Sequence, residues 1–361
     1  MKKVYLYAYD RQNLGDDLFV HTITKRYPNV QFYIWTGAEN KAIFKCLPNL
    51  KIIDKNSKWV QFLHKIRPSL VSRYRYALED KCDAVVYIGG SIFMEDPDWQ
   101  RLTQWWDYEA ESRPFLALGC NFGPYTSEAY REKMASIYGK MKDVCFRDRY
   151  SYELFKDIPT VRQAPDILFN CPMPQICADE KNVFVSLIDC GGWGKSEELK
   201  NAEESYISGM ARLLSEYLEK GYSLTLASFC HIEGDESAIA KLRQAMGVCA
   251  DDNRVRDLYY DGTNADALLS AIAGAGFVVA SRFHATILAL AAGRPVLPII
   301  YSDKTVHVLE DLGYNGVTVD LRKENWVSYD EAEANRAVIT PIDTVKKQAQ
   351  GHFAVLEQLI K

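Results

Sequence analysis

The chain lacks the sequence signatures of several large classes of protein. Its nine cysteines contain no C-x-x-C pair and its six histidines contain no H-x-x-x-H pair, so neither a disulfide framework nor a metal site is expected. It has no uninterrupted run of about 20 apolar residues, and its N-terminus has no apolar core of a signal peptide. These absences predict a cytoplasmic protein with reduced cysteines and without a bound metal.

An excess of basic residues is also missing. The chain has 43 Lys and Arg residues against 48 Asp and Glu residues, which gives a formal net charge of −5. We find neither the basic excess nor the basic stripe that is typical of nucleic-acid proteins, so no nucleic-acid partner is expected. A few arginines can still form a local site for a small anionic substrate within an acidic protein.

The sequence does contain a regular alternation of short apolar runs with longer helical patterns. Runs such as "DAVVYIGG" (83–90) and "FLALGC" (115–120) predict buried strands. The pattern restarts at "VFVSLI" (183–188), after the linker-like segment "NCPMPQICADEKN" (170–182). This alternation predicts an α/β protein with two Rossmann-like, doubly wound domains that face each other across a cleft.

The restart also sets the expected domain boundaries. We expect an N-terminal Rossmann-like domain over residues 1–172 and a C-terminal one over residues 180–335. Residues 340–361 form a further predicted helix, for which packing back on the N-terminal domain is one arrangement. Because ligands of such sheets bind beyond the carboxyl ends of the strands, the loops that follow strands are the candidate functional sites.

One candidate loop, "RQNLGDD" (11–17), follows the first predicted strand. Asn13 and Gly15 are candidates for substrate binding, because glycine allows a backbone shape that other residues avoid. Asp16 is a candidate base or hydroxyl-binding group. The alternative is that Asp16 and Asp17 only cap the helix that begins there.

A second candidate loop, "IGGS" (88–91), follows the strand over residues 83–88. Gly89, Gly90 and Ser91 would let backbone N–H groups approach an anion or a sugar oxygen closely. An ordinary tight turn is the alternative.

A third candidate is the arginine at the start of "RDRYS" (147–151). Arg147 follows a predicted strand, where a guanidinium can hold a carboxylate or a phosphate with two hydrogen bonds. The alternative is a structural ion pair, in which Arg147 or Arg149 binds Asp148 or Asp166.

The segment "SRFHA" (281–285) is the strongest candidate. Ser281, itself a candidate for substrate binding, ends a predicted strand. Arg282 and His284 therefore lie at the N-terminus of the following helix, where the helix dipole favours an anion. An arginine and a titratable imidazole there suit a phosphate or carboxylate with a proton donor beside it. Lys304 follows the next strand and is a further candidate for the same site.

Together these segments resemble the polysaccharide pyruvyl transferase family. The resemblance extends over about residues 5–315 and rests on "NLGDD" (13–17), "IGGS" (88–91), "GP" (123–124), "FRDRYS" (146–151), "APDILF" (164–169) and "SRFHATILALAAGRPVLPIIYSDK" (281–304). No G-x-G-x-x-G, Walker or G-x-S-x-G motif is present to favour another family.

The resemblance implies a GT-B-like fold and an enzyme that transfers a pyruvyl group from phosphoenolpyruvate to a sugar diol as a ketal, in cell-surface polysaccharide biosynthesis. It implies that Arg282 and His284 act on phosphoenolpyruvate, that Lys304 and Arg147 help to hold this donor, and that Asp16 serves the acceptor. The N-terminal domain would bind the acceptor and the C-terminal domain the donor, with no cofactor.

The resemblance leaves several properties open. A lipid-linked acceptor, a peripheral contact with the inner face of a membrane and a homo-oligomer all remain open. The chain also departs from the family pattern, with Ser91 where many members have glycine, and with Ile188 and Asp189 where some have an arginine. Two alternative functions are a GT-B glycosyltransferase that uses a nucleotide sugar and a non-catalytic carbohydrate-binding protein.

Overall fold

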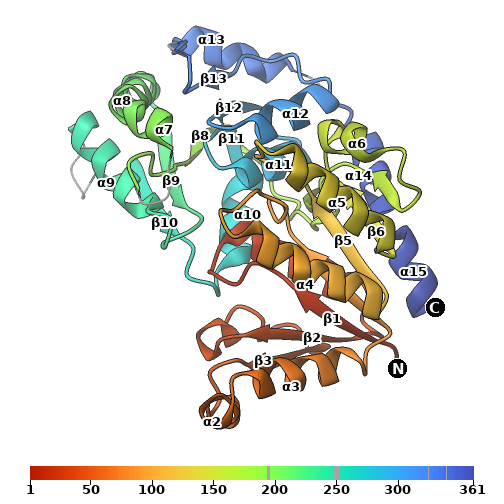
Figure 1. Cartoon of the computed structure of the whole chain (residues 1–361). Helices are drawn as coiled ribbons and strands as arrows, with labels where there is room; N and C mark the ends of the chain where they lie inside the picture. The colour runs from red at the N-terminus through yellow and green to blue at the C-terminus, as the bar shows by residue number, and fades with distance from the viewer. Residues whose placement is uncertain (193–195, 248–251, 324, 339) are drawn as a thin grey trace. The chain divides into compact units, whose positions relative to one another are not determined.

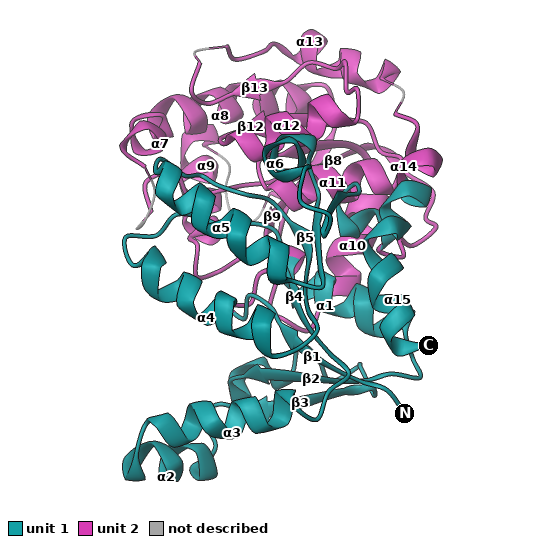
Figure 2. Cartoon of the chain, turned by 45° about the vertical axis from the view of Figure 1, so that its right-hand side comes forward, with its two compact units in different colours: residues 1–10, 16–170, 346–361 teal, residues 11–15, 171–345 magenta. Residues whose placement is uncertain are grey.

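The computed structural model of the chain describes residues 1–192, 196–247, 252–323, 325–338 and 340–361. They form two compact units, which Figure 2 draws in teal and magenta. Unit 1 comprises residues 1–10, 16–170 and 346–361, and unit 2 comprises residues 11–15 and 171–345. The sequence after "VFVSLI" is the glycine-rich segment "DCGGWGKS" (189–196), which we expect to form a loop, and its residues 193–195 lie outside the described residues.

Unit 1 holds a sheet of seven parallel strands. Its strands are β1 (Lys3–Tyr7), β2 (Gln31–Thr36), β3 (Leu50–Asp54), β4 (Ala84–Ile88), β5 (Phe115–Cys120), β6 (Asp143–Phe146) and β7 (Val161–Gln163). They lie in the order β3-β2-β1-β4-β5-β6-β7. The helical segments between β1 and β8 are α1 (Leu14–Arg26), η1 (Ala38–Lys41), α2 (Lys58–Ile66), α3 (Ser69–Glu79), α4 (Trp99–Ser112), α5 (Glu128–Lys140), α6 (Arg149–Phe155) and η2 (Ile167–Asn170).

Unit 2 repeats this topology with six parallel strands. They are β8 (Asp179–Ser186), β9 (Ser223–Ser228), β10 (Val255–Tyr259), β11 (Ala275–Ala280), β12 (Val296–Ile300) and β13 (Val319–Asp320), in the order β10-β9-β8-β11-β12-β13. Its helical segments are α7 (Glu197–Asn201), α8 (Glu203–Glu219), α9 (Asp235–Met246), α10 (Ala265–Ala273), α11 (Phe283–Ala291), α12 (Asp303–Asp311), α13 (Tyr329–Glu333) and η3 (Ala334–Ala337). Two doubly wound parallel sheets confirm the predicted fold class.

The central strands are uniformly apolar because both faces of a parallel sheet are covered. Every residue of β5, β6, β11 and β12 is buried. The edge strand β10 instead has exposed residues. Each unit therefore builds its own core around the middle of its sheet.

The strand order determines where a ligand site can form. The order reverses between β1 and β4 in unit 1, and between β8 and β11 in unit 2 (Figure 1). Loops at the carboxyl ends of two such strands diverge and leave a crevice, which is the usual ligand site of doubly wound sheets. The segments 11–17, 88–91 and 281–285 all follow β1, β4 or β11.

The C-terminal tail differs from the single helix that the sequence predicts. It is divided into α14 (Ile342–Ala349), a 3-10 turn η4 (Gln350–Phe353) and α15 (Ala354–Ile360). In the turn, the ring nitrogen Nε2 of His352 lies 2.8 Å from the carbonyl oxygen of Pro165, and Arg162 donates to the His352 carbonyl at 2.6 Å. The tail thus holds the segment that carries Asp166.

His352 makes the stability of this packing dependent on pH. Burial, assisted by the charge of Arg162, lowers the pKa of His352 to about 3. The ring stays neutral in the folded state but takes up a proton near its ordinary pKa of about 6.5 in the unfolded chain. The unfolded state therefore binds more protons between these two values, and stability falls as the pH drops through this window.

We expect His352→Gln, which keeps a donor but does not titrate, to lose less stability on acidification than the wild type. Between about pH 7.5 and about pH 5 the difference should reach about 2 kcal/mol. Urea unfolding at both values measures it. Equal losses in both proteins would show that His352 does not titrate in this way.

Candidate functional site

Arg147 in unit 1 is buried and held by two side chains. It follows β6 and is only 2 % exposed. Its Nη1 lies 3.0 Å from Oδ2 of Asp166, and its Nη2 donates to Oδ1 of Asn121 at 2.7 Å. The ion pair with Asp166 was one alternative for this arginine, and the structure contains it.

The glycine turn after β4 packs against this guanidinium. A side-chain carbon on Gly90 would lie 2.6 Å from Nη1 of Arg147, so only glycine fits there without a shift. Gly89 donates to Leu118, and the hydroxyl of Ser91 donates to Oδ1 of Asn121 at 3.2 Å. The predicted residues of this loop therefore share one network with Arg147. The Arg147 network comprises Gly90, Ser91, Asn121, Arg147 and Asp166.

Asp16 lies in the first turn of α1 and is partly buried, while Asp17 is fully buried. Burial, followed by the charge of Asp16, raises the pKa of Tyr87 to about 12. Tyr87 belongs to β4, one of the two strands at which the order of this sheet reverses. Asp16 itself follows β1, the other strand of this reversal, and its negative charge acts on the hydroxyl of Tyr87.

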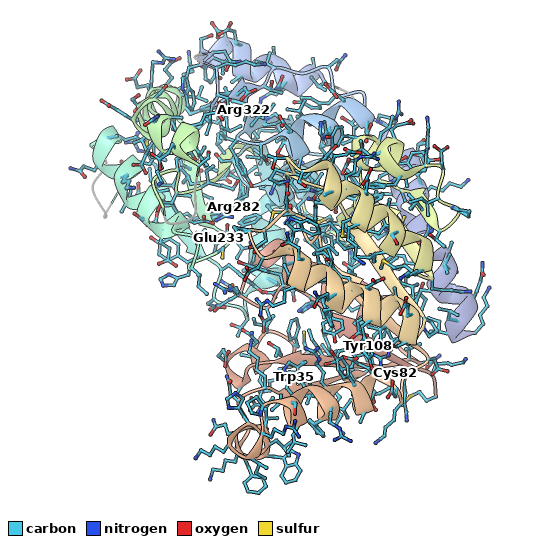
Figure 3. All side chains as sticks on the ribbon, viewed as in Figure 1. Trp35, Cys82, Tyr108, Glu233, Arg282 and Arg322 are labelled. Atoms are coloured by element: carbon cyan, nitrogen blue, oxygen red, sulfur yellow. The ribbon has the colours of Figure 1, made fainter. Side chains whose placement is uncertain are left out.

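In unit 2, Arg282 is also buried between acidic side chains. It precedes α11, and its guanidinium contacts Asp235 through Nε at 3.0 Å and through Nη2. Its Nη1 donates to Oε2 of Glu233. The side-chain amide of Asn13 donates to Oε1 of the same carboxylate at 3.3 Å. Figure 3 shows Glu233 and Arg282 side by side. The Arg282 network comprises Asn13, Glu233, Asp235 and Arg282.

The charges in this network are unequally exposed. Asp235 is fully buried, whereas the side chain of Glu233 is 28 % exposed. Burial alone would lower the pKa of Arg282, but Asp235 and Glu233 raise it well above its ordinary value, so the guanidinium stays charged. Asp235 anchors Arg282 inside the unit, and Glu233 occupies its outer side.

Ser281 is part of the framework beneath this site. It is 1 % exposed, and its hydroxyl lies 2.8 Å from the hydroxyl of Tyr206. Tyr206 in turn accepts a hydrogen bond from the backbone of Ile188 at the end of β8. The backbone N–H of Arg282 donates to the hydroxyl of Ser186 at 3.1 Å. These bonds join the ends of β8 and β11, so the start of α11 is fixed.

His284 is the one residue of α11 that is not fully buried. Its ring packs directly on the backbone of Gly15, where an added side-chain carbon would lie 1.7 Å from Nδ1. Residues 11–15 are held in unit 2 by the Leu14 N–H, which donates to the carbonyl of Phe229 at 3.1 Å. Gln12 adopts a positive φ of 50°, an uncommon conformation that often marks functional loops.

Lys304 lies near the same helix start. Its ammonium is 5.8 Å from the ring of Phe283 and 5.3 Å from the ring of Tyr301. Phe283 stands between Arg282 and His284 in the chain. The structure therefore brings Asn13, Gly15 and Lys304 near the start of α11.

Sequence reasoning missed Asn121, Glu233 and Asp235. Asn121 directly follows β5, so its place at a strand end was an available signal. Glu233 and Asp235 lie in "HIEGDES" after β9, but their carboxylates meet an arginine 47 to 49 positions away, and only the tertiary fold reveals this.

Within the described ranges, no group of three or more His, Cys, Asp and Glu side chains is arranged to hold a metal ion. All eight described cysteines are free thiols. None of the described helices is both long and apolar enough to cross a membrane.

The contact between Gly15 and His284 gives a structural prediction. Gly15→Ala should push the imidazole of His284 out of its place, because 1.7 Å is far below any allowed contact. The ring resonances of His284 in NMR spectra should shift, and unfolding should cost about 1–3 kcal/mol less. Gly139→Ala is the control, since nothing lies within 4 Å of the added carbon. Unchanged His284 resonances in Gly15→Ala would contradict the contact.

The fold resembles that of sugar-nucleotide enzymes. UDP-GlcNAc 2-epimerase from Neisseria meningitidis superposes with a TM-score of 0.61 over 99 % of this chain and 100 % of that chain, at 12 % identity. Anabaena Alr3699/HepE in complex with UDP and glucose gives a TM-score of 0.56 over 99 % and 98 %, also at 12 % identity. At this identity the similarity shows the fold alone, which is of the GT-B and epimerase kind.

Comparison of sequences identifies the family more closely than comparison of folds. Amylovoran biosynthesis protein AmsJ of Erwinia amylovora is 22 % identical over 276 residues, which cover 70 % of this chain and 65 % of that protein. The match thus spans slightly less than two thirds of that relative's length. The family model "Polysaccharide pyruvyl transferase" matches residues 13–303, from the loop at Asn13 to the start of α12. This chain therefore belongs to the polysaccharide pyruvyl transferase family.

Proposed function

We propose that the protein transfers a pyruvyl group from phosphoenolpyruvate to two hydroxyls of a sugar, as a ketal, during polysaccharide biosynthesis. The observation that carries the proposal is the position of Arg282 and His284. Both lie at the start of α11, at the strand reversal of unit 2, in a chain whose family match spans residues 13–303. The name of the AmsJ relative supports polysaccharide assembly as the setting.

The donor carries a carboxylate and a phosphate, so its site must supply positive charge. The N-terminus of α11 and the ammonium of Lys304 contribute to it. Arg282 stays anchored to Asp235, and its Nη1 exchanges the carboxylate of Glu233 for an oxygen of the donor. Glu233 suits this exchange because it is the more exposed of the two partners. His284 stands beside the donor as a proton donor.

The reaction itself needs one proton on the methylene carbon of the donor. That step produces a methyl group and a cationic, oxocarbenium-like carbon, which one sugar hydroxyl attacks while it loses its proton. The carbon–oxygen bond to phosphate then breaks, and the second hydroxyl attacks the same carbon and closes the ketal ring, while its proton passes to the released phosphate. In this proposal His284 delivers a proton to carbon or to the leaving phosphate, and Asp16 accepts a hydroxyl proton.

The Arg147 network is assigned to substrate binding from unit 1. Arg147 is engaged with Asp166 and Asn121, and it supports the turn formed by Gly89, Gly90 and Ser91. The backbone of this turn and the hydroxyl of Ser91 are the groups that would meet the substrate.

The test is an acceptor screen with phosphoenolpyruvate, in which phosphate release and the mass of the saccharide product are measured. We expect release only with a suitable sugar diol. His284→Ala should lower the rate by about 100- to 10,000-fold, the usual worth of a positioned acid or base. His231→Ala is the matched control, because this histidine is 71 % exposed in the same unit.

Other outcomes would reject the proposal. Near wild-type ketal formation in His284→Ala would remove His284 from the mechanism. Stabilisation against heat by a nucleotide sugar, and none by phosphoenolpyruvate, would favour a glycosyltransferase. Binding of saccharide without any turnover would favour a non-catalytic binding protein.

The exchange between Glu233 and the donor can be measured separately. Glu233→Gln removes the competing charge, so the KM for phosphoenolpyruvate should fall by about tenfold, which corresponds to about 1.4 kcal/mol. Glu236→Gln is the control, since Glu236 pairs with the exposed His231 at 3.0 Å. A KM that rises in Glu233→Gln would show instead that Glu233 positions Arg282 for the donor.

A further inference from the structure

One segment of unit 1 has a charge pattern unlike the rest of the chain. Residues 55–78 contain no Asp or Glu, although the whole protein carries a net charge of −5. This segment is therefore locally basic within an acidic protein. Its six cations are Lys55, Lys58, Lys65, Arg67, Arg73 and Arg75.

Helix α2 in this segment exposes large apolar side chains. Trp59, Phe62 and Ile66 are 55 %, 52 % and 59 % exposed. Their spacing of three and four residues places them on one face of the helix. The rings of Trp59 and Phe62 stack with their centres 5.8 Å apart. This face is a continuous apolar stripe that the described chain leaves open to solvent.

Another side of α2 packs against unit 1. Val60 is the buried residue of α2, and the helix begins at a Ser57 cap. Figures 1 and 2 place α2 at the outer end of unit 1, beyond the edge strand β3. The stripe is therefore not needed to fill the core of the unit.

Exposed cations lie along α2 and after it. Lys58, Lys65, Arg67 and Arg73 are exposed, and none of them takes part in an ion pair among the described residues. Lys55 and Arg75, by contrast, pair with Asp10 and Glu79. We define the α2 patch as Lys58, Trp59, Phe62, Lys65, Ile66 and Arg67.

A hollow of about 490 Å³ opens beside the same helix. Lys55, His64 and Lys65 line it together with the ring of Trp35. Lys65 thus belongs to both the hollow and the α2 patch. The hollow is also lined by Val60 and Gln61, so it lies on a different side of α2 from the apolar stripe.

We propose that the α2 patch docks the protein on the surface of an anionic lipid bilayer. Trp59, Phe62 and Ile66 enter the boundary between headgroups and acyl chains, and the three cations of the patch, Lys58, Lys65 and Arg67, attract the anionic headgroups. A helix with an aromatic and aliphatic face bordered by lysine and arginine is typical of such interfacial contacts. The proposal does not depend on the reaction proposed above.

The observations favour a bilayer over other partners. A nucleic acid would need a larger positive surface than four free cations on a protein of net negative charge. A second copy of the chain would bring a second set of the same cations to the same stripe, and like charges would face each other across the contact.

The test is co-sedimentation of the full chain with vesicles, either of phosphatidylcholine alone or of phosphatidylcholine mixed with phosphatidylglycerol. We expect binding to the anionic vesicles that weakens with salt, and little binding to the neutral ones. The double variant Trp59→Ser and Phe62→Ser should lower the partition coefficient at least about tenfold. Lys58→Glu with Lys65→Glu should lower it by at least about fivefold per charge. Ile232→Ser, which alters a residue that is 59 % exposed in unit 2, should have no effect.

Three results would overturn the proposal. The first is the absence of wild-type binding to anionic vesicles. The second is unchanged binding in the Trp59 and Phe62 double variant while circular dichroism shows an intact fold. The third is a partner of another kind, seen either as an oligomer that the double variant breaks or as nucleic-acid binding without vesicle binding. Turnover of a soluble acceptor, measured in parallel, tests the proposed reaction independently.

Discussion

The buried carboxylate of Asp235 is the interaction on which the candidate site of unit 2 depends. It accepts hydrogen bonds from the backbone of Phe229 and Cys230 after β9, and from Nε and Nη2 of Arg282 before α11. One side chain thus fixes the ends of two strands and the orientation of the guanidinium. A buried carboxylate is tolerable only because so many donors compensate for the loss of water.

Each unit buries an arginine, and the side chains that bind the guanidinium differ between Arg147 and Arg282. The guanidinium of Arg147 binds the carboxylate of Asp166 and the amide oxygen of Asn121, and the glycine turn packs against it. Arg282 has two carboxylates, so its surroundings carry an excess negative charge. The first arrangement suits a permanent support for a glycine turn. The second suits a site in which an incoming anion replaces one resident carboxylate.

Much of the fold follows from local sequence patterns. β5 occupies Phe115–Cys120, the same residues as its apolar run, and α6 occupies "RYSYELF" (149–155). These elements were predictable because strand and helix periodicities are local properties. The helical spacing of Trp59, Phe62 and Ile66 in α2 was also visible in the sequence, but only the structure shows that this apolar face is turned to solvent and not to the core.

The candidate site was predictable only in part. The strand ends located Arg147, Arg282 and His284, since parallel strands bring their carboxyl ends to one edge. Of the partners of these residues, only Asp166 was anticipated, as one alternative for an ion pair with Arg147. Glu233 and Asp235 are ordinary acidic residues in the sequence, and only the tertiary fold brings them to Arg282.

The path of the chain limits how this protein can be divided. Residues 11–15 belong to unit 2 by their contacts, although the residues before and after them belong to unit 1, and the last sixteen residues return to unit 1. A C-terminal fragment that begins at the linker near residue 171 would lack Asn13 and Gly15. It would therefore lose the contact of His284 with Gly15 and the hydrogen bond from Asn13 to Glu233. The units are thus separate in packing but interleaved in sequence. Exchange of one unit between family members would have to carry the short loop after β1 with it.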